Sequence, residues 1–174
     1  MHAALEAAGI GVGDEVIVPP LTMASTAFAV LQANATPIFS DINIDTFQIC
    51  PDSIEKKITP NTKAVITVAL YGGAPGLKRI RQISDKHGLF MLEDNAECFG
   101  ATLDGTPVGC FGDAASFSFQ SSKHLTAGEG GILLVKDQEL ADKIRSFQSL
   151  GYAGVGAKSA KINKNIIQDP SYKR

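Results

Sequence analysis

Short apolar runs rich in valine and isoleucine alternate with segments of helical period along this chain, and this alternation restricts its fold more than any other feature. Six runs predict strands, at residues 15–18, 36–40, 64–68, 89–92, 115–119 and 131–135. Five segments between them predict helices, at residues 3–8, 22–33, 51–58, 76–87 and 137–150. Most runs are almost continuously apolar, as strands covered on both faces are. The sequence therefore predicts an α/β fold with a mostly parallel sheet and helices on both faces.

The composition of the chain excludes several classes of binding partner. The chain has 174 residues with a formal net charge of −2, so it lacks the overall positive charge that holds nucleic acid or an anionic membrane surface. The longest apolar runs, such as residues 64–70, are far shorter than the ~20 residues of a membrane span, and no secretory leader opens the chain. Three cysteines without CxxC spacing predict neither a zinc site nor a disulfide framework. We therefore expect a cytoplasmic protein with no metal and small charged metabolites as partners.

The residues best suited to chemistry lie between positions 92 and 131. One predicted strand ends in Glu93 and Asp94, and another leads into a serine-rich turn that contains Lys123. Ligands of parallel α/β sheets lie outside the carboxyl ends of the strands, so Asp94 is a site candidate, or else a cap for the turn that follows. Lys123 is either a solvated surface charge or part of a site, because serine hydroxyls before it and glycines after it suit a phosphate. Together these residue types match the needs of pyridoxal phosphate (PLP).

Several segments in a fixed order carry a family resemblance: Gly9–Pro19, Ala35–Phe39, Tyr71–Gly72 followed by Pro75, Leu92–Ala101, Gly112–Asp113, Ser116–Phe119 and Lys123–Gly131. As a set they resemble the DegT/DnrJ/StrS family of sugar-nucleotide aminotransferases over about residues 1–150. The resemblance implies a fold-type-I PLP-transferase large domain.

The resemblance also implies roles for three residues. Lys123 matches the lysine that forms a Schiff base with the cofactor, and Asp94 matches the partner of the pyridine nitrogen. Ser118 matches the serine that binds the cofactor phosphate. Lys123 and Asp94 are thus the expected catalytic residues, and all three are expected to bind PLP.

Three further positions are expected near the cofactor. Glu97 stands where the family usually has glutamine or histidine beside the 3′ oxygen of the ring, so an acid is a departure there. Met23 occupies the position of an aromatic residue stacked on the ring, or else it is a core methionine of the helix predicted from Thr22. His124 either touches the cofactor phosphate or fills space beside it.

The resemblance implies PLP-dependent transamination of a nucleotide-linked keto-sugar, with an amino acid, expected to be glutamate, as donor. Such chemistry belongs to nucleotide-sugar and polysaccharide biosynthesis, and the complete chain is expected to form a homodimer. One alternative is a PLP-dependent sugar dehydratase of the same family, although that branch carries histidine in place of Lys123. The other is a cofactor-binding fragment without activity.

The resemblance further implies how the chain is divided. Residues 1–156 are expected to form a PLP-binding large domain that is incomplete at its N-terminus, because the Gly-Thr or Gly-Ser loop that holds the cofactor phosphate would precede Met1. Residues 157–174 are expected to be a basic tail that leads to a C-terminal domain.

Overall fold

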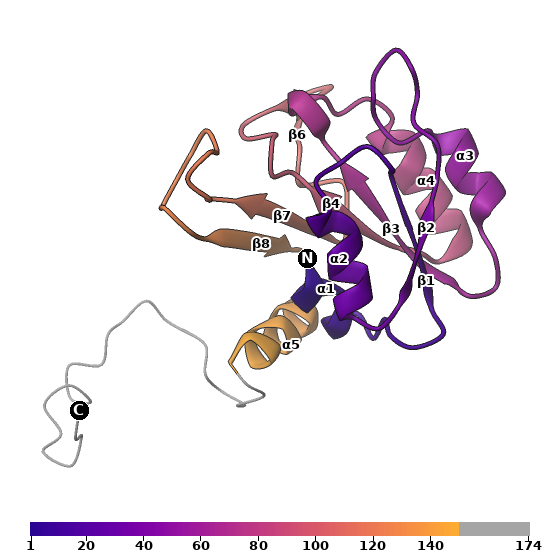
Figure 1. Cartoon of the computed structure of the whole chain (residues 1–174), viewed down its shortest axis with the longest axis horizontal. Coiled ribbons are helices and arrows are strands. Elements are labelled where there is room, and N and C mark those ends of the chain that lie inside the picture. The colour runs from indigo at the N-terminus through magenta and orange to yellow at the C-terminus, as the bar shows by residue number, and fades with distance from the viewer. Residues whose placement is uncertain (150–174) are drawn as a thin grey trace, which may run out of the picture.

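Six strands form one sheet in the order β2-β1-β3-β4-β7-β8 in the computed structural model, which describes residues 1–149 (Figure 1). The strands are β1 Glu15–Val18, β2 Thr36–Phe39, β3 Thr62–Val68, β4 Phe90–Asp94, β7 Ala114–Ser118 and β8 Gly131–Val135. The first five pair in parallel, and β8 pairs antiparallel with β7. A small antiparallel hairpin joins β5 Thr102–Leu103 to β6 Thr106–Pro107. The mostly parallel sheet predicted from the apolar runs is confirmed.

All five predicted helices are present. They are α1 His2–Ala7, α2 Ser25–Gln32, α3 Pro51–Lys57, α4 Leu77–His87 and α5 Gln138–Gln148, with a short 3₁₀ turn, η1, at Leu70–Gly72. Gly88 ends α4 in the left-handed conformation, with φ of 64°, which glycine adopts readily. Helix α2 begins at Ser25 rather than Thr22, because its hydrogen-bond series starts at the carbonyl of Ala24, which accepts from the Phe28 N–H.

Alternate residues of the central strands build two separate cores. Val16 and Val18 of β1 pack in a cluster with residues of α1, α2 and α5, whereas Ile17 packs in a second cluster with residues of α3 and α4. In β4, Leu92 belongs to the first cluster and Met91 to the second. Helices α3 and α4 lie side by side in Figure 1, on the side of the sheet that the second cluster covers. The sheet is therefore covered on both faces, as its apolar strands require.

No helix among residues 1–149 is long and apolar enough to cross a membrane. The last position of the helix predicted over 137–150 and the expected basic tail at 157–174 lie outside the described residues. The described part of the chain is thus the sheet with its five helices, and the site is built on that part.

Candidate active site

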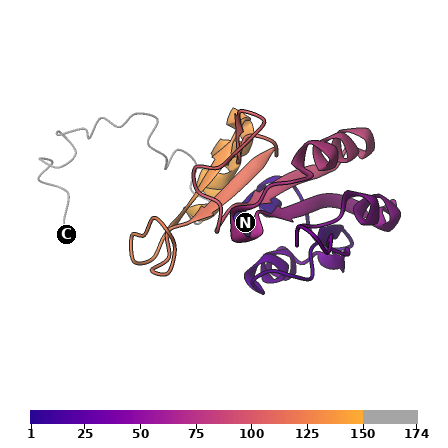
Figure 2. The same ribbon diagram turned by 90° about the horizontal axis from the view of Figure 1, so that it is seen from above.

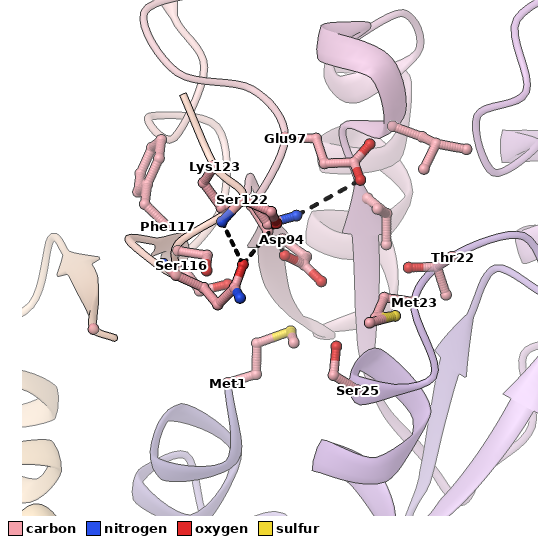
Figure 3. Close-up of a pocket in the computed structure, with 16 residues that line it drawn as sticks. Met1, Thr22, Met23, Ser25, Asp94, Glu97, Ser116, Phe117, Ser122 and Lys123 are labelled. Atoms are coloured by element: carbon pink, nitrogen blue, oxygen red, sulfur yellow. Dashed lines mark hydrogen bonds and ion pairs between the residues drawn. The ribbon is translucent and has the colours of Figure 1, made fainter. Parts of the chain in front are cut away.

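A cavity of about 540 Å³ opens at the carboxyl ends of β4 and β7, where parallel α/β sheets bind their ligands. Five of the six predicted site residues line it: Met23, Asp94, Glu97, Ser118 and Lys123. They come from three separate parts of the chain, namely the turn before α2, the end of β4 with its following turn, and the end of β7 with its following loop (Figure 3). The fold therefore brings together residues that the sequence had marked at distant positions.

Asp94 ends β4 at the floor of this cavity and is only 4% exposed. Its Oδ2 accepts a hydrogen bond from the Thr26 hydroxyl at 2.9 Å, and its Oδ1 accepts one from the Ala96 N–H at 3.3 Å. Burial raises the pKa of the Asp94 carboxyl by desolvation, and these hydrogen bonds oppose that rise. Asp94 both braces the turn after β4 and faces the cavity, where a cationic ligand group would stabilise its ionised form.

Glu93, the neighbouring acid, has a different environment that the sequence reasoning did not assign. It is fully buried and accepts backbone N–H bonds from Gly109 at 2.8 Å, Phe111 at 2.8 Å and Gly112 at 2.5 Å. Successive strand residues point to opposite faces, so Glu93 holds the loop before β7 while Asp94 faces α2. The alternation within β4 is the signal that could have separated the two acids.

Lys123 lies in the loop between β7 and β8, which projects beyond the sheet in Figure 2. Its Nζ is 3.7 Å from Oε1 of Glu97, a contact drawn in Figure 3. The other carboxylate oxygen of Glu97 accepts the Tyr71 N–H at 3.2 Å. Glu97 therefore connects the lysine loop to the turn after β3, and it is close enough to orient the Lys123 amine.

Ser118 and Met23 complete the cavity. Ser118 is the last residue of β7, is partly buried, and accepts the Gln120 N–H through its hydroxyl at 3.3 Å. Met23 is 76% exposed and precedes α2, so the interpretation as a core methionine is wrong. Its side chain offers an apolar surface at the cavity instead.

His124 faces a different space. It is exposed and lines a second cavity of about 680 Å³, and it is absent from the lining of the first. The second cavity shares Lys123 and Glu97 with the first, so the two spaces adjoin at the lysine. His124 therefore lines the second cavity, whereas Ser118 lines the first.

The residues around the first cavity fit PLP. The cofactor needs an amine for its aldehyde, a carboxylate for its ring nitrogen, hydroxyl or N–H donors for its phosphate and an apolar surface for its ring. Lys123, the buried carboxylate of Asp94, the Ser118 hydroxyl and the exposed Met23 thioether supply one of each. Among residues 1–149, no group of three or more histidine, cysteine or acidic side chains could hold a metal ion.

The model of the DegT/DnrJ/EryC1/StrS aminotransferase family matches residues 1–167. The chain belongs to this family. Its members are PLP-dependent aminotransferases, so both the resemblance seen in the sequence and the predicted fold class are confirmed.

Known proteins of this family are similar to the chain over most of its length. The L-glutamine:2-deoxy-scyllo-inosose aminotransferase of Streptomyces kanamyceticus is 44% identical over 148 residues, which are 85% of this chain and 35% of that protein. The GDP-perosamine synthase of Escherichia coli O157:H7 is 43% identical over 153 residues, 88% of this chain and 42% of that protein. The chain therefore spans less than half of the length of these relatives.

A solved structure shows the same fold. The crystal structure of NtdA from Bacillus subtilis, which has the cofactor PMP bound, is 36% identical and superposes with a TM-score of 0.84. The match covers 93% of this chain and 37% of NtdA.

Proposed function

We propose that this chain supplies the PLP-binding large domain of an enzyme that transaminates a nucleotide-linked keto-sugar. The observation that carries the proposal is that the Lys123 amine and the buried Asp94 carboxylate line one cavity. The names of the relatives, which include a perosamine synthase and an inosose aminotransferase, support a sugar or a sugar-like ring as the amino acceptor. We assign glutamate as the donor, residues 1–156 to the large domain, and a homodimer to the complete protein.

Each residue has a separate task in this function. PLP, when bound, supplies the reactive carbonyl and the electron-withdrawing ring that amino transfer requires. Lys123 binds the cofactor through Nζ and, once released, takes the proton from the α-carbon of the amino donor. Asp94 holds a positive charge at the ring nitrogen, which makes the ring a better electron acceptor. Ser118 donates its hydroxyl to the phosphate, and Glu97 orients the Lys123 amine before the cofactor arrives.

Covalent labelling of Lys123 tests the proposal directly. The chain is incubated with PLP and reduced with borohydride, and the modified peptide is mapped by mass spectrometry. We expect stoichiometric label on Lys123 and only background label on Lys136, an exposed lysine in the same chain. Label spread evenly over the lysines would contradict the assignment of the site.

A variant at Lys123 tests the attachment of the cofactor and the amino transfer together. The Lys123→Ala chain should lose the specific label and all amino transfer from glutamate, measured as 2-oxoglutarate formed. Undiminished amino transfer in this variant would exclude Lys123 as the catalytic lysine. Specific label without amino transfer in the unmodified chain would favour a cofactor-binding fragment without activity.

A further inference from the structure

Thr26 is a fully buried polar residue that the proposed function has not used. It lies in the first turn of α2, and its hydroxyl donates to Oδ2 of Asp94 at 2.9 Å. The two residues are 68 positions apart in the sequence, so this hydrogen bond joins α2 to the end of β4. A hydroxyl that is removed from water needs a hydrogen-bond partner, and the partner of Thr26 is the carboxylate at the first cavity.

The direction of the Thr26 hydroxyl differs from a common pattern in helices. A threonine in a helix often bonds to the carbonyl four residues earlier, which for Thr26 is the carbonyl of Thr22. Here Thr22 offers its own hydroxyl instead, with 2.9 Å between the two Oγ1 atoms. The Thr26 O–H therefore points away from its own helix and toward β4.

The two threonines form a chain of hydroxyls with a fixed direction. An ionised carboxylate only accepts hydrogen bonds, so the single hydroxyl proton of Thr26 is used at Asp94. The contact between the two hydroxyls then requires Thr22 as the donor and Thr26 as the acceptor. Hydrogen bonds in such a chain polarise and strengthen one another in a protein interior. Thr22 lines the first cavity on the turn before α2 (Figure 3), so the chain reaches from the cavity wall to Asp94.

Asp94 is held at both of its oxygens and still has acceptor positions for a ligand. Oδ1 accepts the Ala96 N–H at 3.3 Å, while Oδ2 accepts the Thr26 hydroxyl at 2.9 Å. These two bonds use two of the roughly four acceptor positions of an ionised carboxylate. The bond to Ala96 is longer and spans only two residues, so the link to α2 is the one that fixes the carboxylate against the rest of the fold.

The Thr26 hydroxyl also acts on the charge of Asp94. Burial raises the pKa of this carboxyl by desolvation, and the Thr26 hydrogen bond opposes that rise more strongly than the Ala96 N–H does. The positive charges that act on Asp94 are the α-amino group of Met1 and the amine of Lys123, and both lower its pKa further. A carboxylate pairs with a cationic ring nitrogen only while it is ionised, so Thr26 favours the state that the proposed function requires.

We propose that Thr26 is a positioning residue for Asp94, and that Thr22 extends this support through the hydroxyl chain. The pair holds the carboxylate in one orientation at the floor of the cavity, where it meets the ring nitrogen of the cofactor. Thr26 is not among the described residues that line the cavity, so it acts only through Asp94. This inference rests on the proposed function and adds the residues that keep one of its two catalytic groups in place.

Carbon-13 NMR of the cofactor-free chain, labelled at its aspartate carboxyls, tests the support of Asp94 without PLP. The Asp94 resonance is identified by its loss in the Asp94→Asn variant. We expect Thr26→Val, which keeps the branched shape of the side chain, to move the titration of Asp94 to higher pH, because the carboxylate loses a donor. Thr26→Ser keeps the hydroxyl and should titrate like the unmodified chain. An unchanged titration in Thr26→Val would overturn the proposal.

Two further variants separate the hydroxyl chain from the general loss of a threonine hydroxyl. Thr22→Val should move the titration of Asp94 in the same direction but by less, and no movement would exclude Thr22 from the chain. Thr62→Val is the matched control, because Thr62 is 5% exposed and its hydroxyl also donates to a carboxylate, that of Glu15 at 3.2 Å. Neither Thr62 nor Glu15 lines the cavity, so the control should leave the titration of Asp94 unchanged. Equal movement in Thr26→Val and Thr62→Val would count against a specific link.

The affinity for PLP tests whether this support acts on the cofactor. A PLP analogue in which carbon replaces the ring nitrogen has no cationic ring atom and cannot pair with Asp94. We expect Thr26→Val to raise the dissociation constant of PLP about five- to tenfold, and that of the analogue by less than about twofold. Equal losses for the two ligands would indicate a merely structural role for Thr26 and overturn the proposal.

Lys123 labelling with PLP, measured on the same preparations, distinguishes the two ideas. Specific label together with an unchanged titration of Asp94 in Thr26→Val would keep the proposed function and reject the role of Thr26. Absence of specific label in the unmodified chain would instead reject the function on which this role rests.

Discussion

Replacing Glu93 by glutamine tests how much the buried carboxylate stabilises the loop before β7, whose backbone N–H groups it accepts. In the native chain, Oε1 accepts the N–H groups of Phe111 and Gly112, and Oε2 accepts that of Gly109. Glutamine has nearly the same shape and can keep its oxygen on the first two donors. Its NH₂ group then faces the Gly109 N–H, so one partly buried donor loses its acceptor.

The expected loss follows from these three hydrogen bonds. An unsatisfied donor costs about 1–3 kcal/mol when it is fully buried, so the partly buried Gly109 N–H lies at the lower end of this range. Each of the two remaining bonds loses about 1 kcal/mol when its acceptor becomes neutral. Removal of a buried charge offsets part of this loss, because ionised groups are expensive to desolvate. We expect Glu93→Gln to lower the free energy of unfolding by about 2–4 kcal/mol, a large part of the 5–15 kcal/mol of a typical domain.

Urea denaturation followed by circular dichroism measures this change. The midpoint should fall while the slope of free energy against urea stays constant, because the unfolded surface is unchanged. Glu139→Gln is the control, since the Glu139 side chain is 78% exposed and its ion pair with Lys143 lies at the surface, where such pairs contribute little to stability. If Glu93→Gln lowers the free energy of unfolding no more than this control does, the carboxylate does not stabilise the loop and the reasoning is refuted.

Three further changes have defined outcomes. Gly112→Ala should lower the free energy of unfolding, measured by urea denaturation, by about 2 kcal/mol or more, because a Cβ there would lie 2.7 and 2.8 Å from backbone oxygens of β4 and β7. Gly11→Ala is the control: the nearest atom to its Cβ would lie at 3.8 Å, and the free energy of unfolding should change by less than about 1 kcal/mol. Because burial raises the pKa of Asp94, the folded chain binds more protons than the unfolded chain between the two pKa values, and stability falls as pH rises through that window. The stability of Asp94→Asn relative to the unmodified cofactor-free chain should therefore be higher at pH 7 than at pH 4, and an equal difference at both pH values would contradict this reasoning. Asp137→Ala should lower the free energy of unfolding, measured by thermal denaturation, by about 1 kcal/mol, because Asp137 is the N-cap of α5 and its Oδ1 accepts the Leu140 N–H at 2.7 Å. Asp137→Ser should retain most of this stabilisation, because serine is also a favourable N-cap residue.

The elements of the fold were predictable because each strand needs an apolar run to be covered on both faces. The predicted strand at residues 64–68 is the apolar part of β3, which extends to Thr62 because Thr62 pairs with Glu15. The direction of β8 was not predictable, because an apolar run is the same whichever way its strand is paired. The hairpin of β5 and β6 has two residues in each strand, which is too short to produce a periodic pattern.

The site was predictable only in part. Asp94 and Lys123 could be chosen because strand ends and family motifs both mark them, and the cavity includes both. The sequence could not show that Glu93 belongs to the loop at 109–112, since that contact depends on how the chain returns after β4. Met23 was ambiguous for a similar reason, because its exposure depends on where α2 begins.

The opposite orientation of Glu93 and Asp94 has a consequence for how the chain tolerates insertions and deletions. Adding or removing one residue within β4 would move each side chain to the other face and exchange the structural carboxylate of Glu93 with the cavity-facing carboxylate of Asp94. β4 pairs with β3 on one side and β7 on the other, so it cannot slide to compensate without breaking both sets of backbone hydrogen bonds. Changes in length are therefore compatible with the site only in the loops outside β4, where they leave the phase of its side chains intact.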